Sequence, residues 1–119
     1  MKISVLTIIL SISTLFTFAQ VSTIIRGIAS EEKSGSVLEF ATVSLVDPKD
    51  GKILKSGQTD LKGQFIFENI EKGAYIFTVS FVGYSNFSQN IVVNENSKVL
   101  DLGKLKIKKS STSLLNEVV

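Results

Sequence analysis

Residues Gln58 to Tyr84 read QTDLKGQFIFENIEKGAYIFTVSFVGY. Within them, two runs alternate apolar and polar residues on either side of a turn-like segment, Asn69 to Gly73. Such alternation over short runs is typical of β-strands that bury one face. A second turn-like segment, Asp60 to Gly63, precedes the first run and is expected, like the other, to close a short hairpin. The pattern predicts a small antiparallel β-sandwich.

The same pattern extends along the chain in both directions. No segment beyond Ala19 has helical periodicity, and turn-forming glycine, proline, aspartate and asparagine residues separate the apolar runs. Seven strands are expected, at Thr23–Ala29, Ala41–Val46, Ile53–Thr59, Gln64–Glu68, Tyr75–Val82, Phe87–Val93 and Leu100–Lys108.

Alternation also assigns each side chain to a face of its sheet. The expected core positions are Ile25, Gly27, Ala29, Ala41, Val43, Leu45, Phe65, Phe67, Tyr75, Phe77, Val79, Phe81, Ile91, Val93, Leu105 and Ile107. The expected outward positions are Arg26, Thr42, Ser44, Gln64, Ile66, Glu68, Ile76, Thr78, Ser80, Lys104, Lys106 and Lys108. Each large apolar side chain contributes roughly 1.5–3 kcal/mol when buried, so this core is expected to hold the domain without disulfides.

Composition limits the chemistry of the chain. A length of 119 residues favours a single domain. With 13 Lys and Arg against 11 Asp and Glu, the charge is too balanced to indicate nucleic-acid binding. The sequence contains no His and no Cys, which removes the commonest metal ligand and general base together with all thiolate chemistry. We therefore expect no enzyme activity and no cofactor, and assign no catalytic, cofactor-binding or metal-binding residue.

The first residues have the layout of an export signal. Lys2 precedes an apolar run from Ile3 to Phe18, and Thr17 and Ala19 are the small residues of a cleavage site before Gln20. A retained membrane anchor is the alternative, but a spanning helix needs about 20 apolar residues. The expected organisation is a signal peptide at 1–19, a β-sandwich at 20–109 and a linker at 110–119.

Several motifs together resemble a known family. They are Gly27, Ala41–Leu45, Gly57 to Phe65 with its Thr-Asp-x-x-Gly core, Gly73-x-Tyr75 and Phe81-x-Gly-Tyr84. From Ser22 to Val119 the chain resembles a carboxypeptidase-regulatory-like domain, which implies an all-β, seven-stranded antiparallel Greek-key sandwich of the transthyretin-like type. Two positions depart from the family pattern. Val37 to Phe40 replaces a proline-containing approach to the second strand, and Ala29 stands where a valine is usual.

The resemblance also implies a setting. The close subtype lies at the N-terminus of TonB-dependent receptors and related outer-membrane β-barrel proteins of Bacteroidetes-type bacteria. There, a segment like Leu115-Asn-Glu-Val-Val119 leads into the plug domain, so residue 119 is expected to be a cut or a premature end in a longer receptor. The implied location is the periplasmic face of the outer membrane. The implied partners are the plug and barrel of the parent receptor or neighbouring envelope proteins, not nucleic acid.

Two other functions stay open. The chain could be a free-standing secreted module that binds carbohydrate or peptide, or a regulatory domain detached from a peptidase. It lacks the metal ligands of the peptidase itself.

A few residues could carry chemistry. Asp47 and Asp50 beside Gly51 could form part of a calcium loop, but a type I turn explains them better because an EF-hand needs more oxygen ligands. Asp60 could be catalytic, but a turn-capping role is favoured because no His or second carboxylate lies at a fixed spacing.

Related sandwiches sometimes form Lys–Asn isopeptide bonds beside a buried acid. Lys55 or Lys62 with Asn90 or Asn94 would be the candidates here.

Two further features have a structural and a functional interpretation. Lys104, Lys106, Lys108 and Lys109 form a charge run that is either a solvated strand edge or a docking face for a partner. Gly27 and Gly83 lie in or near strands, where a glycine either permits close packing or lines a ligand groove. Packing is favoured for both.

Overall fold

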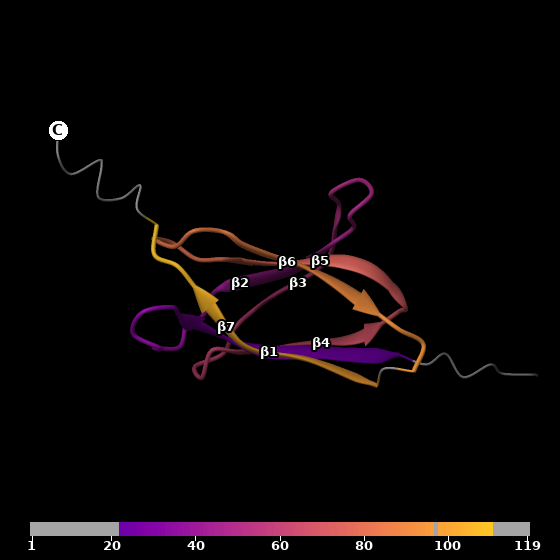
Figure 1. The fold of residues 1–119 in the computed structure, drawn as a ribbon, viewed down its shortest axis with the longest axis horizontal. Coiled ribbons are helices and arrows are strands. Elements are labelled where there is room, and N and C mark those ends of the chain that lie inside the picture. Colours follow the sequence, from indigo (N-terminus) through magenta and orange to yellow (C-terminus); the bar gives the residue numbers. More distant parts are fainter. Residues whose placement is uncertain (1–21, 97, 111–119) are drawn as a thin grey trace, which may run out of the picture.

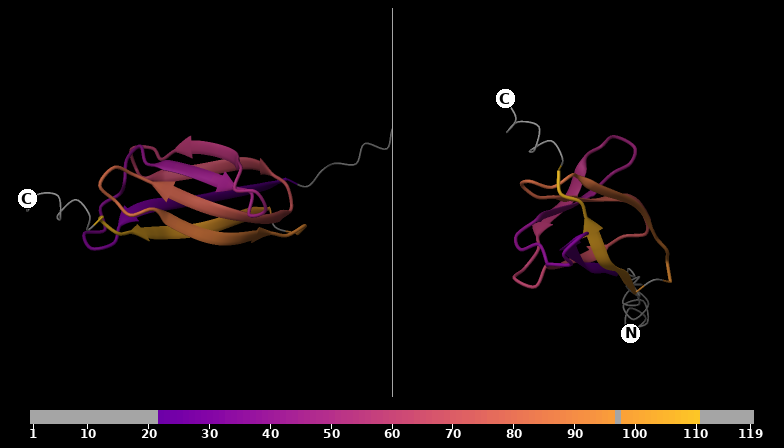
Figure 2. Two further views of the ribbon diagram at one scale, coloured as in Figure 1. Left: turned by 90° about the horizontal axis from the view of Figure 1, so that it is seen from above. Right: turned by 60° about the vertical axis from the view of Figure 1, so that its left-hand side comes forward.

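The computed structural model describes residues 22–96 and 98–110, which form a sandwich of two β-sheets (Figure 1). Its strands are β1 (Thr23–Glu31), β2 (Thr42–Val46), β3 (Ile53–Gln58), β4 (Gln64–Ile70), β5 (Gly73–Ser80), β6 (Phe87–Val93) and β7 (Val99–Ile107). One sheet has the order β4-β1-β7 and the other the order β3-β2-β5-β6. The strands run along the long direction of the molecule, so the loops gather at its two ends (Figure 1, Figure 2).

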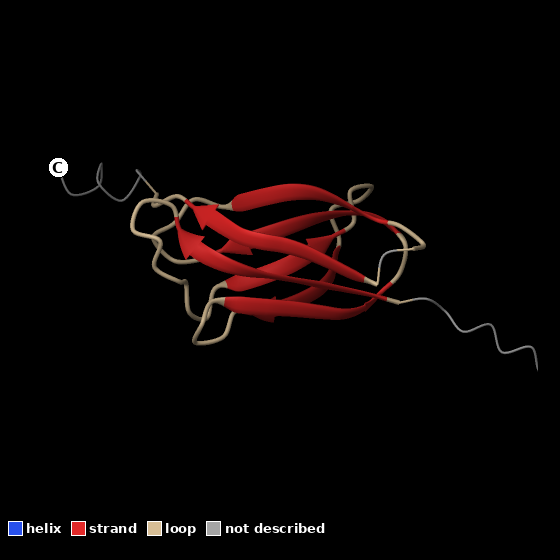
Figure 3. Cartoon of the chain, turned by 60° about the horizontal axis from the view of Figure 1, so that its bottom comes forward, coloured by secondary structure: helices blue, strands red, loops and turns tan. Residues whose placement is uncertain are grey.

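The predicted all-β fold with seven strands is confirmed. Every strand begins and ends within two residues of its expected position, and Phe87–Val93 is unchanged. The described residues contain strands and loops without a helix (Figure 3). The proposed signal peptide and its cleavage after Ala19 lie outside the described residues, as does the linker beyond Ser110.

Two of the expected hairpins are wrong. Within one sheet, consecutive strands pair only as β2–β3 and β5–β6. The turn at Asp60 to Gly63 instead takes the chain from β3 in one sheet to β4 in the other, and Asn69 to Gly73 returns it to β5. Turn residues do not distinguish a hairpin from a crossing, because both sheets bury their alternating side chains in the same core.

One pairing is parallel where the sequence predicted an antiparallel sandwich throughout. β1 and β7 run in the same direction, with Ala29 opposite Leu105, and the remaining pairs are antiparallel. Parallel neighbours need a long connection. The first and last strands have one, since the rest of the domain lies between them.

A bulge in β7 changes which of its side chains face the core. Arg26 lies opposite Asp101 but Ile28 lies opposite Lys104, so β7 has one extra residue here. Gly103 adopts a φ of 72°, a conformation that glycine adopts easily. The Asp101 carboxylate accepts the Gly103 N–H at 2.8 Å and supports the turn of the backbone.

The bulge explains the two apolar pairs of β7. Leu100 and Leu102 pack against the core before it, and Leu105 and Ile107 are buried after it.

The core agrees with the predicted faces. The expected inward side chains are buried, with Tyr75 and Phe81 partly buried against them. Phe65 stacks on Phe77 with ring centroids 4.8 Å apart, and Phe67 meets Phe77 edge-on at 6.3 Å. Ile66 points outward as expected and is 57% exposed. Ser44 also lies on the outward face, but neighbouring strands cover it and leave 6% exposed.

Candidate functional site

The Thr-Asp-x-x-Gly motif joins separate parts of the chain. Thr59 is buried, and its hydroxyl accepts the N–H of Ala41 at 2.9 Å and donates to the carbonyl of Leu38 at 2.6 Å. The Thr59 backbone also bonds to Ala41 and to Phe40. Because a buried polar group is costly without partners, this threonine fixes the loop that leads into β2.

Asp60 and Gly63 complete the same motif. One carboxylate oxygen of Asp60 accepts the N–H groups of Lys62 and Gln64, both at 2.9 Å. Gly63 has a φ of 71°, and a Cβ there would lie 2.7 Å from the carbonyl oxygen of Ala29. Asp60 is therefore a turn-capping residue, as favoured from the sequence, and its geometry gives no support to the catalytic alternative.

Phe40 is a feature that the sequence did not predict. It adopts a φ of 58°, which costs a residue with a side chain roughly 1–2 kcal/mol, and its side chain is 56% exposed. The hydrogen bonds of Thr59 hold the loop in this conformation. No glycine or asparagine marks the position, so the sequence carries no signal for it.

A groove lies over the outer face of the β4-β1-β7 sheet. It has a volume of about 680 Å³. Its lining residues are Arg26, Gly27, Ile28, Gln58, Asp60, Gln64, Phe65, Ile66, Asp101, Gly103 and Lys104. Arg26 and Asp101 form an exposed ion pair within it, with nitrogen and oxygen 3.3 Å apart. Amide, charged and apolar groups line it together, so it offers both hydrogen-bonding and apolar contacts.

The groove brings together three of the candidate residues from the sequence, Gly27, Asp60 and Lys104. A Cβ on Gly27 would lie 2.7 Å from the ring of Phe65 and 3.0 Å from the carbonyl oxygen of Gly103. Gly27 is therefore required for close packing, although it also lines the groove. Gly83 lies in the loop between β5 and β6, where its φ of 86° is the feature that favours glycine.

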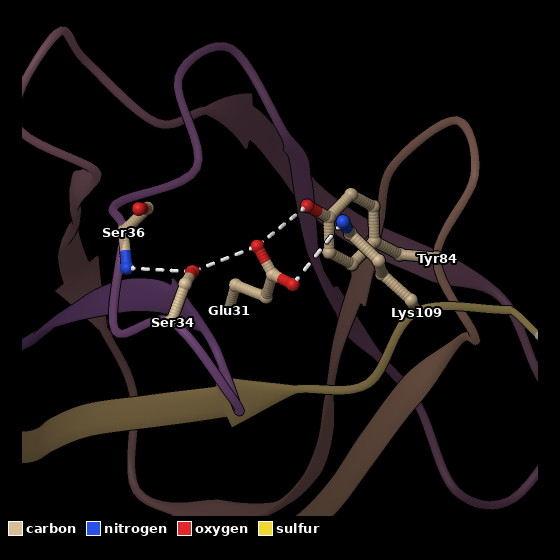
Figure 4. A network of polar contacts seen from close by, with 5 residues as sticks. All are labelled: Glu31, Ser34, Ser36, Tyr84 and Lys109. Atoms are coloured by element: carbon tan, nitrogen blue, oxygen red, sulfur yellow. Dashed lines mark hydrogen bonds and ion pairs between the residues drawn. The ribbon is translucent and has the colours of Figure 1, made fainter.

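A network of polar side chains lies next to the last residues that the structure describes, 108–110 (Figure 4). Glu31, at the end of β1, is its centre, with a side chain 13% exposed. The carboxylate accepts the hydroxyl of Ser34 at 2.8 Å and that of Tyr84 at 3.4 Å, and its other oxygen lies 3.4 Å from Nζ of Lys109. Three segments distant in the sequence therefore meet at one carboxylate.

These contacts lower the pKa of Glu31 below its ordinary value of 4.5. The hydroxyl of Ser34 is the largest cause, opposed by partial burial and assisted by Lys109 and Tyr84. The carboxylate is thus held in its charged form.

Backbone hydrogen bonds strengthen the same junction. Ser85 donates its N–H to Lys108 at 2.8 Å, and Ser110 donates to Gly83 at 2.9 Å. Tyr84 and Lys109 form an antiparallel bridge. Ser110 was expected to begin the linker, but this bond ties it to the sandwich. We call this junction of 31–34, 83–85 and 108–110 the exit clamp. The sequence gives no signal for it, because its residues lie far apart in the chain.

The lysine run is divided between two environments. Lys109 belongs to the exit clamp. Lys104 and Lys106 on β7, and Lys108 directly after it, are exposed. Within 22–96 and 98–110, no ion pair involves these three lysines.

Asp47 and Asp50, the candidates for a calcium loop, instead accept backbone hydrogen bonds within a turn. Asp47 accepts the N–H of Lys49, and Asp50 accepts that of Lys52, both at 2.9 Å. Gly51 closes the turn with a φ of 72°. In the part of the chain that the structure describes, no group of three or more His, Cys, Asp or Glu residues could hold a metal ion.

The isopeptide candidates lie apart. Lys55 is on β3 and Asn90 on β6, the opposite edges of their sheet, and Lys55 donates to the carbonyl of Glu68. The buried polar side chains of the described residues are Thr23, Ser30, Ser44 and Thr59, so no acid is buried among them. The described residues also contain no helix long and apolar enough to cross a membrane.

Several solved structures that are similar to this chain are pilus proteins. The major pilin subunit BcpA of Bacillus cereus matches with a TM-score of 0.61 and 20% identity over 75% of this chain and 30% of its own. The TIE protein of Bacillus anthracis matches with a TM-score of 0.62 and 22% identity over 75% of this chain and 17% of its own.

The group B streptococcus pilus 2b backbone protein matches with a TM-score of 0.59 and 11% identity, over 78% of this chain and 43% of its own. This chain thus spans less than half the length of each of the three, and at these identities the likeness shows a shared β-sandwich fold.

The sequence comparisons give one match. A search of the curated proteins found none. The family model of the CarboxypepD_reg-like domain matches residues 25–119, which includes every strand of the sandwich except the first two residues of β1. The chain therefore belongs to the CarboxypepD_reg-like domain family.

Proposed function

We propose that this chain is a non-catalytic N-terminal accessory domain of a TonB-dependent outer-membrane receptor. It faces the periplasm and supports substrate import through contacts with the plug and barrel of the receptor or with neighbouring envelope proteins. Membership of the CarboxypepD_reg-like family and the resemblance of residues 115–119 to a plug lead-in support this setting.

The exit clamp is the observation that carries the proposal. Main-chain bonds hold Lys108 and Ser110, and the carboxylate of Glu31 holds Lys109. Because Lys108, Lys109 and Ser110 are fixed from two sides, the sandwich sets the direction of the chain at Ser110. β1 begins and β7 ends at opposite ends of the molecule, so the domain acts as an oriented spacer (Figure 1).

An in-frame deletion of residues 22–110 in the native gene tests the receptor setting. We expect the full-length product to fractionate with the outer membrane and to be reached by protease only after the outer membrane is opened. We expect the deletion to reduce uptake of the imported substrate while the remainder stays in the membrane. Secretion of the unmodified product into the medium would contradict the proposal.

The role of the clamp is tested with a finer change. Glu31→Gln combined with Lys109→Ala weakens the junction without touching the core. We expect uptake to fall with this double variant and to stay unchanged with Glu32→Gln combined with Lys62→Ala, which makes the same charge changes at exposed positions. Equal uptake by the two double variants would show that the direction in which the clamp holds the chain does not matter for import.

A free-standing secreted module for carbohydrate or peptide is the second candidate, and the groove over β4, β1 and β7 favours it. Under this function the mature domain would appear outside the cell without a barrel attached. The fractionation above separates the two candidates.

A further inference from the structure

We propose that the free edge of β7 is a docking edge for an acidic peptide strand, which pairs with the backbone of Lys104 and Lys106 and places carboxylates beside their side chains. The inference rests on the geometry of this edge and not on the receptor setting.

The hydrogen bonds of β7 show which of its residues face the free edge. The carbonyl of Ile107 accepts the N–H of Glu32, and that of Leu105 accepts the side-chain hydroxyl of Ser30, so both carbonyls face β1. The carbonyl of Lys108 instead accepts from Ser85, on the other side. Backbone groups alternate in direction along a strand, so Lys104 and Lys106 present their N–H and C=O groups to the free edge.

The free edge is open along most of β7. This strand pairs only with β1, and in 22–96 and 98–110 no backbone hydrogen bond reaches Lys104 or Lys106 from the other side. An extended peptide can add to such an edge as a further strand.

The protein itself shows how such a strand would lie. Tyr84 and Lys109 form an antiparallel bridge, and Ser85 continues it with its bond to Lys108. The chain then leaves this edge, because β6 begins at Phe87 in the other sheet. A peptide that continues the same antiparallel pairing would reach Lys106 first and Lys104 next.

Charge selects the occupant. Lys104, Lys106 and Lys108 point away from the core on one face and have no ion-pair partner among the described residues. Side chains directly opposite each other in antiparallel strands lie on the same face. A peptide with acidic residues at every second position therefore meets two lysines spaced about 6.8 Å apart.

Edge lysines also serve to prevent pairing between copies of a protein. An edge that serves only as a guard would bind no added strand at a measurable concentration, whether acidic or not. The two roles therefore predict different responses to peptide charge.

A synthetic peptide, acetyl-Thr-Val-Glu-Val-Glu-Val-Thr-amide, tests the proposal on the full chain by NMR titration and fluorescence anisotropy. We expect amide shifts at Lys104, Lys106 and their neighbours, and binding that weakens as salt shortens the screening length. We expect Lys106→Glu to weaken binding by about fivefold or more, the equivalent of a cross-strand charge pair. Lys49→Glu, the same change in the β2–β3 turn, should leave affinity within about twofold.

Two control peptides keep the test sharp. In one, lysine replaces both glutamates, and it should not bind. In the other, N-methyl groups replace the N–H groups that face β7, and it should bind at least about tenfold more weakly, since its strand pairing is lost. If either control peptide bound as tightly as the acidic peptide, the proposal would be overturned. It would also be overturned if the acidic peptide failed to bind at millimolar concentration, and these lysines would then only protect the edge from pairing.

Discussion

At the scale of single residues, the family motifs prove to be structural. Thr59 bonds to the loop before β2, Asp60 caps its own turn, and Gly63 lies against the backbone of Ala29. Each of them makes contacts that hold the chain in place, although Asp60 also lines the groove. The motif identifies the fold because these contacts join segments that alternation alone cannot bring together.

Gly27 gives a direct test of packing. We expect Gly27→Ala to reduce the free energy of unfolding by about 1–3 kcal/mol, because the new methyl group overlaps the ring of Phe65. Gly57→Ala is the matched control, since its Cβ would have only an ordinary contact of 3.9 Å with Val43. Urea denaturation of both variants checks the difference, and equal stability would show that the ring moves aside at no cost.

Glu31 predicts a pH dependence of stability. Its pKa is lowered in the folded protein, mainly by the hydroxyl of Ser34, so the unfolded chain binds more protons at intermediate pH. The stabilisation is present above the unfolded value and is lost as pH falls through the folded one. We expect the free energy of unfolding of Glu31→Gln to fall less than that of the wild type between about pH 6 and about pH 3.

Glu95 adds a similar but exposed contribution through Lys72. The measurement is urea denaturation across this pH range, with Glu32→Gln as control. A Glu31→Gln variant that follows the wild-type pH curve would show that the clamp does not hold the carboxylate in solution.

At the scale of elements, the sequence predicts the strands better than their pairing. Alternation reports which side chains are buried, and it placed Phe65, Phe67 and Ile66 correctly. It does not report which sheet a strand joins, because both sheets share one core. Alternation therefore could not predict the parallel β1–β7 pair or the crossings between sheets at 60–63 and 69–73.

The candidate sites were harder to predict than the strands. The groove and the exit clamp both combine β1 with residues near the C-terminal end of the domain, such as Asp101 and Lys109. Such sites depend on the β1–β7 pairing. A sequence that does not reveal this pairing cannot reveal what the pairing brings together.

The face assignment itself can be tested with one charge. Phe67 is buried, so we expect Phe67→Asp to reduce stability by at least about 4 kcal/mol and to unfold the domain. Lys106 is exposed on the outer face, and Lys106→Asp should be tolerated. Thermal unfolding followed by circular dichroism measures both. Similar melting temperatures for the two variants would contradict the burial of Phe67.

At the scale of the whole molecule, the parallel pairing of β1 and β7 fixes where the described chain enters and leaves. Both strands start at one end and finish at the other (Figure 1). Ser22 precedes β1 and Ser110 follows β7, and these two strands are paired with each other. A load applied between these positions is therefore carried across the bonds that join β1 to β7.

This arrangement predicts that the domain resists force along one direction. Pulling from residue 22 against residue 108 slides β1 along β7, so many hydrogen bonds must break together. Pulling from residue 22 against residue 98 separates the starts of the same strands, where Ile24 bonds to Lys98, and the bonds can break one after another.

The chain has no cysteine, so two double variants give unique attachment points at exposed positions: Ser22→Cys with Lys108→Cys, and Ser22→Cys with Lys98→Cys. In single-molecule pulling at equal loading rates, we expect a clearly higher unfolding force for the first pair. Equal forces would mean that the β1–β7 contact does not set the mechanical barrier.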